Sequence, residues 1–315
     1  MTRVLITGGC GFIGSNLTEF LLEKTDWDIN VLDNLSTGKL EDITSLKDYR
    51  ERVNFFNGDI TNVNDITKSI KYCQYVINLA AHTSIIESLH DPLFDQKVNI
   101  LGLLKLLKLS VEFKIKKFIQ ASSAAVLGAQ IMPINEQNVP LPESPYGASK
   151  LAGEGYCSAF HGSYGLRCVV LRFSNVYGPK SYNKSSVIPK YIKRILNGKE
   201  LEVFGDGNQT RDFIHVKDIC QGIFLSCMKN TNGFNIFQLG TGIETSIKIL
   251  IEELKNIVKK KHINMVDIKY FDEKKGEIKY SYSDISKAKE RLGFFNHYNL
   301  KSGMLETFEW FMNYK

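Results

Sequence analysis

A glycine-rich turn near the N-terminus restricts the possible folds of this chain more than any other feature. The turn, Thr-Gly-Gly-Cys-Gly-Phe-Ile-Gly, covers residues 7–14 and stands between a strand-like run at residues 3–7 and a helical pattern at residues 11–24. Its glycines have a GxxGxxG spacing, which permits a tight turn and a close approach of the backbone to a pyrophosphate. The N–H groups at the start of the helix then bind the anion. The turn therefore predicts a dinucleotide-binding unit.

Asp33 adds a second element to this prediction. It ends the next strand-like run, at residues 29–33, and lies 19 residues after Gly14. A carboxylate at this position binds both hydroxyls of an adenosine ribose and repels a 2′-phosphate. The turn and Asp33 together predict NAD as the cofactor, in preference to NADP.

Short β-rich runs alternate with helical patterns over the first half of the chain. Such alternation predicts βαβ units, and hence an α/β fold with a Rossmann-type doubly wound parallel sheet. We expect strands at residues 3–7, 29–33, 53–57, 75–78, 117–121 and 167–173, and helices at residues 11–24, 92–111 and 145–164.

The second half of the chain has a looser pattern. Helices are expected near residues 187–196, 216–228, 245–258, 284–291 and 300–311, between loops rich in glycine and asparagine. We therefore predict an NAD-binding domain over residues 1–174 and a smaller, mixed substrate domain over residues 175–315. A segment near residues 212–240 is expected to return to the first domain.

The composition excludes several other classes of protein. The 315 residues are 43% hydrophobic and 23% charged, and no apolar run approaches the ~18–20 residues that span a bilayer. The first residues lack the apolar stretch of a signal peptide, and the six cysteines form no CxxC pair, so a cytoplasmic protein with reduced thiols is expected. The six histidines lack metal-ligand spacing, so no metal is predicted. The net charge of +6 forms no basic stripe interleaved with aromatics, which favours a small anionic ligand over nucleic acid or a membrane.

Tyr146 and Lys150 form a candidate catalytic pair. They stand four residues apart near the start of the helix expected at residues 145–164, so both side chains share one face. A phenol with a pKa of about 10 is a poor base at pH 7, but a nearby ammonium group and an oxidised nicotinamide favour the phenolate. Ser122 and Ser123 follow an expected strand, at the carboxyl end where parallel sheets bind ligands. We predict that Ser123, Tyr146 and Lys150 are catalytic, with Ser123 relaying a proton to the tyrosine.

Together these motifs resemble the extended short-chain dehydrogenase/reductase family, in particular its NAD-dependent nucleotide-sugar epimerases and dehydratases. The pattern is closest to the UDP-glucose and UDP-N-acetylglucosamine 4-epimerases within that family. The resemblance extends over nearly the whole chain and rests on an ordered set of motifs. Beside the turn, they are residues 33–38, 58–60, 79–82, 98–102, 146–150, 175–179 and 204–216.

The resemblance implies roles for individual residues. The implied cofactor contacts are Gly8, Gly11, Phe12, Ile13, Gly14, Asp33, Asn34, Ser36, Thr37, Gly38, Asp59, Ile60, Leu79, Ala80, Ala81, Asn99, Ser122, Tyr146 and Lys150. The implied contacts to a nucleotide sugar are Ser84, Ser123, Tyr146, Asn175, Val187, Arg211, Lys274, Glu277 and Ser281, with Asn175 and Arg211 at the pyrophosphate. Family members are commonly homodimers joined through the helices that we place at residues 92–111 and 145–164, so a homodimer is expected.

The expected reaction depends on what replaces the dehydratase motif. Dehydratases of the family carry Thr-Asp-Glu where this chain has Ser123-Ala124-Ala125, and related decarboxylases tend to carry Glu at the position of Ala125. Elimination of water needs an acid and a base, and two alanines supply neither. The resemblance therefore favours epimerisation of a nucleotide sugar at C4 through a transient 4-keto intermediate. Tyr146 takes the proton of the 4-hydroxyl, while a hydride passes to NAD and returns to the other face of the sugar.

The favoured substrates are UDP-glucose/UDP-galactose or UDP-GlcNAc/UDP-GalNAc. Ser281 falls where some hexose-only epimerases have a bulky aromatic residue, and its small side chain is compatible with an N-acetyl group at C2. Two alternatives remain open. One is another modification through a 4-keto intermediate, by a dehydratase, a decarboxylase or a uronic-acid epimerase. The other is a non-catalytic NAD-binding regulator.

Three positions depart from the pattern of the family. Leu127 replaces the usual tyrosine of a Val-Tyr-Gly sequence near the substrate, which predicts a different pocket. His82 stands where glutamine or glycine is common, and we interpret it as a polar lining of the pocket. Lys274 stands where an arginine usually grips the nucleotide phosphates; a lysine keeps the charge but loses the bidentate fork.

Overall fold

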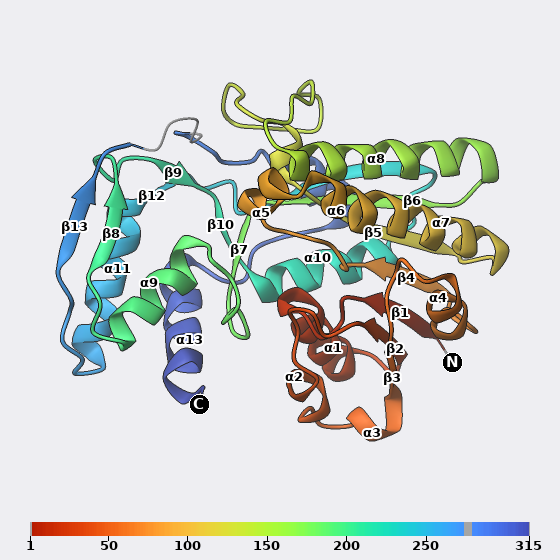
Figure 1. Cartoon of the computed structure of the whole chain (residues 1–315), viewed down its shortest axis with the longest axis horizontal. Coiled ribbons are helices and arrows are strands. Elements are labelled where there is room, and N and C mark those ends of the chain that lie inside the picture. Colours follow the sequence, from red (N-terminus) through yellow and green to blue (C-terminus); the bar gives the residue numbers. More distant parts are fainter. Residues whose placement is uncertain (1, 274–278, 315) are drawn as a thin grey trace.

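The computed structural model describes residues 2–273 and 279–314 and contains a seven-stranded parallel sheet flanked by helices (Figure 1). The strands have the order β11-β6-β5-β4-β1-β2-β3, and every neighbouring pair is parallel. The order reverses between β1 and β4, and such sheets bind ligands outside the strand ends at this point. The α/β Rossmann-type prediction is confirmed. The strands are β1 (Arg3–Thr7), β2 (Asp28–Asp33), β3 (Val53–Asn57), β4 (Tyr75–Asn78), β5 (Lys117–Ser123), β6 (Cys168–Phe173) and β11 (Phe234–Leu239).

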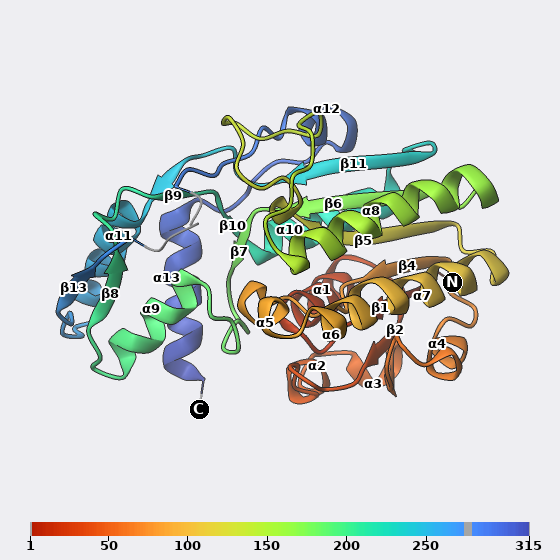
Figure 2. The same ribbon diagram turned by 45° about the horizontal axis from the view of Figure 1, so that its top comes forward.

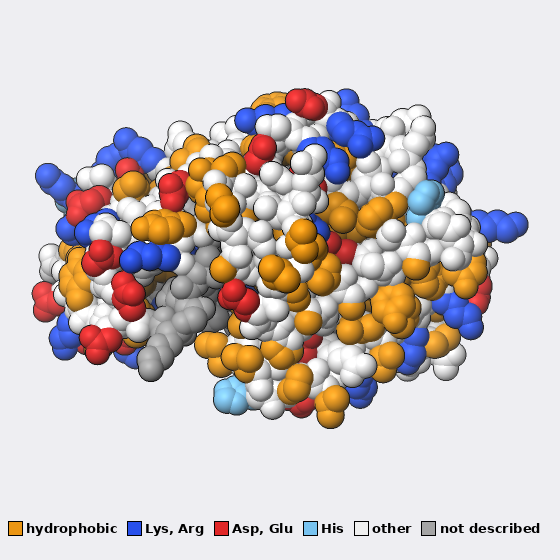
Figure 3. All heavy atoms as spheres, turned by 90° about the horizontal axis from the view of Figure 1, so that it is seen from above, with side chains coloured by type: hydrophobic (Ala, Val, Ile, Leu, Met, Phe, Trp, Pro, Cys, Tyr) orange, Lys and Arg blue, Asp and Glu red, His pale blue; other side chains and the backbone are white. Residues whose placement is uncertain are grey.

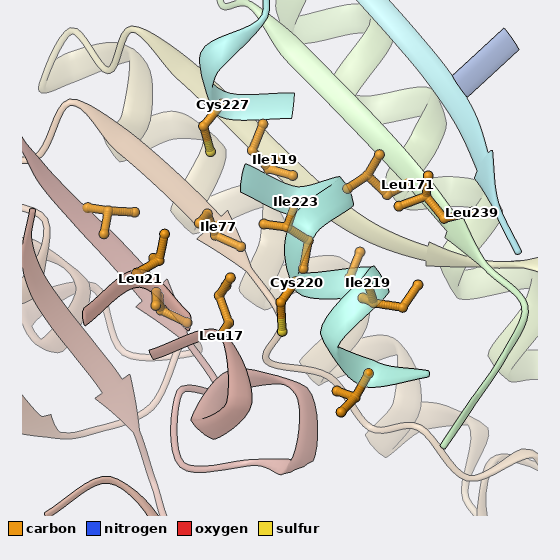
Figure 4. Packing of buried hydrophobic residues seen from close by; sticks show 14 of the residues in the cluster. Leu17, Leu21, Ile77, Ile119, Leu171, Ile219, Cys220, Ile223, Cys227 and Leu239 are labelled. Atoms are coloured by element: carbon orange, nitrogen blue, oxygen red, sulfur yellow. The ribbon is translucent and has the colours of Figure 1, made fainter. Parts of the chain in front are cut away.

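Helices α1 (Phe12–Lys24) and α10 (Val216–Met228) pack against one another on one face of the sheet (Figure 2). Leu17 of α1 and Ile223 of α10 meet Ile77 of β4 in a continuous apolar cluster (Figure 4). All three side chains are buried, and burial of one such side chain contributes about 1.5–3 kcal/mol. This cluster fixes the start of α1, and with it the glycine-rich turn, at the edge of the sheet.

The opposite face of the sheet is covered by α4 (Val63–Ser69), α7 (Leu103–Glu112) and α8 (Pro145–Tyr164). Leu106 of α7 and Cys157 of α8 are fully buried in the apolar cluster on this side. The sheet is therefore buried on both faces, as expected for a parallel sheet made of βαβ units.

The helix expected at residues 92–111 is interrupted. It consists of α6 (Pro92–Gln96), the π-helical segment η1 (Lys97–Gly102) and then α7. Asn99 lies inside the π-helical segment, where its side chain bonds to neighbouring elements instead of facing solvent. Short π-helical segments are rare and frequently occur at functional sites.

A second unit lies beside the carboxyl ends of the central strands (Figure 1). Helices α9 (Val187–Leu196), α11 (Ile247–Lys260) and α13 (Leu300–Asn313) share an apolar core with β8 (Leu201–Phe204), and β13 (Ile268–Phe271) pairs with β8 in parallel. Helix α10 and strand β11, both from the later half of the chain, instead pack on or join the central sheet. The division of the chain near residue 174 stays a prediction.

Helix α12 (Ser286–Leu292) lies close to its expected place at residues 284–291. Strand β11, helix α4 and several shorter elements were not expected from the sequence. Among the described residues, no helix has the length and apolar character needed to cross a membrane. These shorter elements are α2 (Glu41–Thr44), α3 (Tyr49–Arg52), α5 (Ile85–His90), η2 (Ala124–Val126), β7 (Asn175–Tyr177), β9 (Thr210–Arg211), β10 (Phe213–His215) and β12 (Thr245–Ser246).

Candidate active site

The glycine-rich turn joins β1 to α1 at the carboxyl edge of the sheet. Gly8 adopts a positive φ of 68°, and a Cβ on Gly14 would lie 2.2 Å from the carbonyl oxygen of Gly8. Gly11 is the N-cap of α1 and supplies no side-chain cap. The N–H groups of Phe12 and Ile13 in the first turn therefore face the turn without an intrahelical acceptor. Backbone donors line a cradle that a Cβ would fill, which fits a pyrophosphate.

Asp33 lies at the end of β2, beside this turn. Its Oδ2 accepts a hydrogen bond from the Cys10 N–H at 2.9 Å, and its Oδ1 accepts one from the Leu35 N–H at 2.8 Å. Burial raises the pKa of Asp33, and these backbone hydrogen bonds act in the opposite direction. Each carboxylate oxygen has a second lone pair, so Asp33 remains able to accept two hydroxyl groups.

Residues 34–38 form the loop after β2, which we call the ribose loop. A Cβ on Gly38 would lie 2.4 Å from the backbone of the glycine-rich turn, so the loop lies directly on the turn. The Asn34 side-chain amide donates to Asp59 Oδ2 at 2.8 Å. Although burial disfavours the charged form, hydrogen bonds from Thr61 and Asn34 hold the pKa of Asp59 below its usual value. Asp59 is therefore a carboxylate acceptor at neutral pH.

The carboxyl end of β4 completes this edge. Residues 79–81 follow the strand, and the Ala80 N–H donates to Thr7 Oγ1 at 3.3 Å. Asn99 of η1 accepts the His82 N–H at 2.8 Å and donates to the His82 carbonyl at 2.9 Å. The structure thus brings the predicted cofactor residues of the turn, the ribose loop, Asp59-Ile60, residues 79–81 and Asn99 to one edge of the sheet.

Tyr146 and Lys150 lie in the first turns of α8. Ser144 caps this helix, because its Oγ accepts the Gly147 N–H at 3.1 Å. The Lys150 Nζ lies 5.8 Å from the centroid of the Tyr146 ring and donates to the Ala121 carbonyl at 3.2 Å. The predicted spacing on one helix face is therefore present, and Lys150 is held by strand β5.

Burial shifts both catalytic candidates toward their neutral forms. Burial raises the pKa of Tyr146 to about 12, while a hydrogen bond with Ser123 acts in the opposite direction. Burial lowers the pKa of Lys150 to about 8. The buried carboxylate of Asp95 raises both pKa values. Tyr146 is therefore a neutral phenol at pH 7, and a cation close to its oxygen would lower its pKa toward neutrality.

The predicted contacts to a nucleotide sugar come from several elements. Ser84 caps α5 by accepting the Glu87 N–H at 3.1 Å, and Asn175 is the first residue of β7. Val187 begins α9, and Arg211 ends β9. Ser281, half-buried, lies between Tyr280 and Tyr282. Lys274 and Glu277 lie outside the described residues.

Asp212 was not singled out from the sequence, although it lies inside the motif at residues 204–216. It is buried, and its carboxylate accepts the N–H groups of Thr241 at 2.7 Å, Gly242 at 3.2 Å and Ser283 at 3.3 Å. Its carbonyl accepts the Asn175 N–H at 2.9 Å. Asp212 therefore joins three segments on the predicted substrate side.

Glu154 was also not predicted from the sequence. It lies one turn beyond Lys150 on α8 and accepts hydrogen bonds from Arg172 at 2.9 and 2.6 Å and from Ser122 Oγ at 2.6 Å. All three side chains are buried. Its spacing of four residues from Lys150 indicates that both side chains share one face of α8. Its partners, Ser122 on β5 and Arg172 on β6, could not be identified from the sequence.

Two departures from the family pattern have defined places in the structure. Leu127 is fully buried and packs with Val126 in a small apolar cluster, so it fills space instead of lining an open pocket. His82 bonds through its ring to Asp95 at 3.4 Å and to Glu87 at 3.0 Å. His82 therefore joins α5 to α6 near Tyr146.

All six cysteines are buried free thiols. Within residues 2–273 and 279–314, no group of three or more His, Cys, Asp or Glu side chains is placed to hold a metal ion.

The fold and the arrangement of Gly8–Gly14, Asp33, Tyr146 and Lys150 define a dinucleotide-binding α/β protein of Rossmann type. The family model described as GDP-mannose 4,6 dehydratase matches residues 5–307. The chain belongs to this family, and its predicted membership of the NAD-dependent nucleotide-sugar epimerases and dehydratases is confirmed.

Curated relatives and solved structures agree with this assignment. A putative UDP-glucose 4-epimerase of Methanocaldococcus jannaschii is 35% identical and covers 98% of each chain. A UDP-glucuronate 4-epimerase of Thermodesulfobacterium geofontis is also 35% identical, over 98% of this chain and 96% of the relative. The structure of UDP-N-acetylglucosamine 4-epimerase from Methanobrevibacter ruminantium, in complex with UDP-N-acetylmuramic acid, is 36% identical with a TM-score of 0.92, over 100% and 99% of the chains. UDP-glucuronic acid 4-epimerase from Bacillus cereus, with UDP-glucuronic acid and NAD, is 29% identical with a TM-score of 0.91 over the full length of both.

Proposed function

We propose that this protein is an NAD-dependent epimerase that inverts C4 of a UDP-sugar. The observation that carries the proposal is the assembly of Ser123, Tyr146 and Lys150 at the carboxyl edge of the sheet, next to two alanines. A relative named as a putative UDP-glucose 4-epimerase, 35% identical over nearly the whole chain, supports it.

The residues present fit NAD. The glycine cradle offers backbone N–H donors to a pyrophosphate, and Asp33 retains acceptor capacity for ribose hydroxyls. Bound NAD would accept a hydride from the sugar carbon and return it. Several solved structures similar to this chain contain NAD, among them the Thermus thermophilus UDP-glucose 4-epimerase, 29% identical with a TM-score of 0.89.

Side chains of this protein would accept and hold the proton of the sugar 4-hydroxyl. Tyr146 would accept the proton of the 4-hydroxyl, and Ser123, hydrogen-bonded to Tyr146, would hold the sugar oxygen in line. Lys150 remains largely an ammonium group at pH 7 because its pKa is about 8, and its charge favours the phenolate. The two positions that follow Ser123 are Ala124 and Ala125, whose side chains supply neither an acid nor a base.

UDP-glucose and UDP-GlcNAc are the proposed substrates, and UDP-glucuronate is the second candidate. The second candidate is favoured by the 35% identity to a relative named UDP-glucuronate 4-epimerase. A dehydratase reaction is disfavoured by the two alanines, because elimination of water needs an acid and a base beside the sugar.

We also propose a cytoplasmic homodimer. Helices α5 and α6 expose Ile86, Leu89 and Leu93, at 66%, 61% and 75%, and Figure 3 shows apolar side chains gathered over this face. An exposed apolar patch of this kind is typical of a protein interface. The six buried free thiols are compatible with a reducing compartment.

The assignment is tested by the Tyr146→Phe variant with UDP-glucose, UDP-GlcNAc and UDP-glucuronate as substrates. We expect the variant to lose turnover by at least about 100-fold, because it lacks the base, and to retain NAD. Tyr164→Phe, an exposed tyrosine on the same helix, serves as the matched control and should keep wild-type turnover. Wild-type rates in Tyr146→Phe would contradict the mechanism. A wild-type protein that binds NAD but converts none of the three sugars would contradict the activity and favour a non-catalytic NAD-binding regulator.

A further inference from the structure

Residues 178–184, which we call the strap, cross from the second unit onto helix α1. The strap connects β7 to α9, and Figure 1 shows this segment descending beside α1 and α2. The Asn16 side-chain amide of α1 donates to the Pro179 carbonyl at 3.0 Å, and Lys180 Nζ donates to Glu19 Oε2 at 2.8 Å. Both α1 residues lie within two turns of the glycine-rich turn, so the strap is anchored close to the proposed phosphate site.

The strap also holds the segment that begins with the ribose loop. Asn183 Nδ2 donates to the Thr37 carbonyl at 2.5 Å. The Tyr182 hydroxyl donates to Asp42 Oδ2 at 3.1 Å, and Lys180 Nζ donates to the Asp42 carbonyl at 3.3 Å. Side chains of the strap therefore hold residues 37–42 from outside, while Gly38 lies against the glycine-rich turn on the inside.

An aromatic stack reinforces this contact. The Tyr182 ring stacks on Tyr314 with centroids 4.9 Å apart and on Trp310 with centroids 6.0 Å apart. Lys39 lies over the Tyr182 and Tyr314 rings at 4.7 and 5.0 Å and bonds to the Tyr314 hydroxyl. A cation over aromatic faces is attracted by the ring quadrupole. The end of α13 is therefore part of the same contact.

The strap cannot follow the ribose loop outward on its own, because its other side is fixed to the second unit. Lys193 Nζ of α9 donates to the Tyr182 carbonyl at 2.8 Å and to the Lys184 carbonyl at 3.1 Å. The same helix begins at Val187, a proposed contact to the nucleotide sugar. The strap thus links the proposed substrate side to the proposed cofactor side.

We propose that the strap is a latch that retains the bound cofactor, with Tyr182 and Lys180 as positioning residues that hold Asp42, and through it the ribose loop that precedes it, against the glycine-rich turn. The inference rests on the proposed function, since it takes NAD as the cofactor. Asp33 and the ribose loop are the proposed contacts to the adenosine ribose, so dissociation of NAD requires the loop to lift away from the turn. The bonds from the strap to Thr37 and Asp42 must break before it can lift.

The test compares the rate of NAD release between the wild-type protein and the double variant Lys180→Met/Tyr182→Phe. Each full-length protein is loaded with NAD labelled in its adenine, excess label is removed, and unlabelled NAD is added. We expect the double variant to lose label about tenfold faster, because the hydrogen bonds from the strap to Asp42, which follows the ribose loop, and to Glu19 of α1 are removed. Tyr191→Phe is the matched control: it removes a similar hydroxyl bond, to the Glu202 carbonyl at 2.8 Å, within the second unit. This control should release NAD at the wild-type rate.

The outcomes separate the latch from the proposed function. If the wild-type protein and the double variant retain the label equally well, the latch is contradicted and the proposed function is not. A wild-type protein that takes up no NAD overturns the proposed cofactor, and the latch with it. Thermal unfolding of the cofactor-free proteins is measured in parallel. Fast release by a double variant that is folded at the assay temperature supports the latch, and fast release that coincides with its unfolding counts against it.

Discussion

At the scale of single residues, Asp95 adds a negative charge to a candidate site whose pKa values are shifted mainly by burial. It is buried, accepts a hydrogen bond from Asn99 Nδ2 at 3.0 Å, and its negative charge raises the pKa of both Tyr146 and Lys150. The Tyr146–Lys150 pair was predictable because helical spacing places both on one face. Asp95 was not, because its burial depends on how helix α6 packs against α8.

Replacing Asp95 by asparagine should shift the pH dependence of turnover to lower pH. The phenolate of Tyr146 is no longer opposed by a buried negative charge, so the rising limb of the kcat/KM profile moves down. The ammonium group of Lys150 loses the same charge, so the falling limb moves down as well. Asparagine keeps a side-chain oxygen that accepts the hydrogen bond from Asn99, so the variant removes the negative charge without removing this contact. Asp28→Asn, in a pair with Arg3 at the start of β2, is the control. An unshifted profile in Asp95→Asn would contradict this view of the site.

At the scale of elements, helices α8, α9 and α10 and three strands of the central sheet were predicted at their observed bounds. Apolar runs placed β1, β3 and β4 at their observed bounds, because buried parallel strands are continuous and short. Strand β11 was missed, because Asn235 and Gln238 interrupt its apolar run. Both side chains are buried, and the backbone N–H of Gln238 donates to Glu136 Oε1 at 2.7 Å. Glu136 lies 102 residues away in the sequence, so this contact leaves no local signal.

The ion pair of Arg172 with Glu154 ties helix α8 to the sheet, and its loss should destabilise the fold. Arg172→Met leaves a buried carboxylate without its partner, which costs about 3–5 kcal/mol in the free energy of unfolding. Urea unfolding measures this change. Lys255→Met, which breaks an exposed pair with Glu252 at 2.7 Å, should cost less than about 1 kcal/mol. A loss for Arg172→Met as small as that of the control would refute the structural role of the pair.

At the scale of the whole molecule, the sequence indicated a Rossmann-type sheet and a second unit but could not show how they meet. Contacts between the strap and the segment that begins with the ribose loop join residues separated by more than 100 positions in the sequence, such as Tyr182 and Asp42. The placement of Ser281 beside the segment near Ile134 likewise follows from a bridge between Ile134 and Ser283 that no local pattern predicts. The sequence motifs identified the parts of the site, and the tertiary contacts arrange them.

The proposed homodimer is tested at this scale. Leu93→Glu introduces a charge into the exposed apolar face of α5 and α6, and burial of an unpaired charge in an interface is unfavourable. Light scattering after size exclusion should give twice the 35.8 kDa chain mass for the wild type and the single chain mass for the variant. Ile243→Glu, at a residue 62% exposed in the loop between β11 and β12, should remain a dimer. A dimeric Leu93→Glu protein would place the interface elsewhere.

The most direct measurement is a proton NMR time course in D₂O with UDP-glucose or UDP-GlcNAc and no added cofactor. Inversion at C4 by internal return of a hydride predicts conversion to the galacto epimer with no deuterium in the sugar ring. Deuterium at a ring carbon, or accumulation of a keto sugar that has lost water, would contradict the proposed reaction and show proton transfers beyond the 4-hydroxyl.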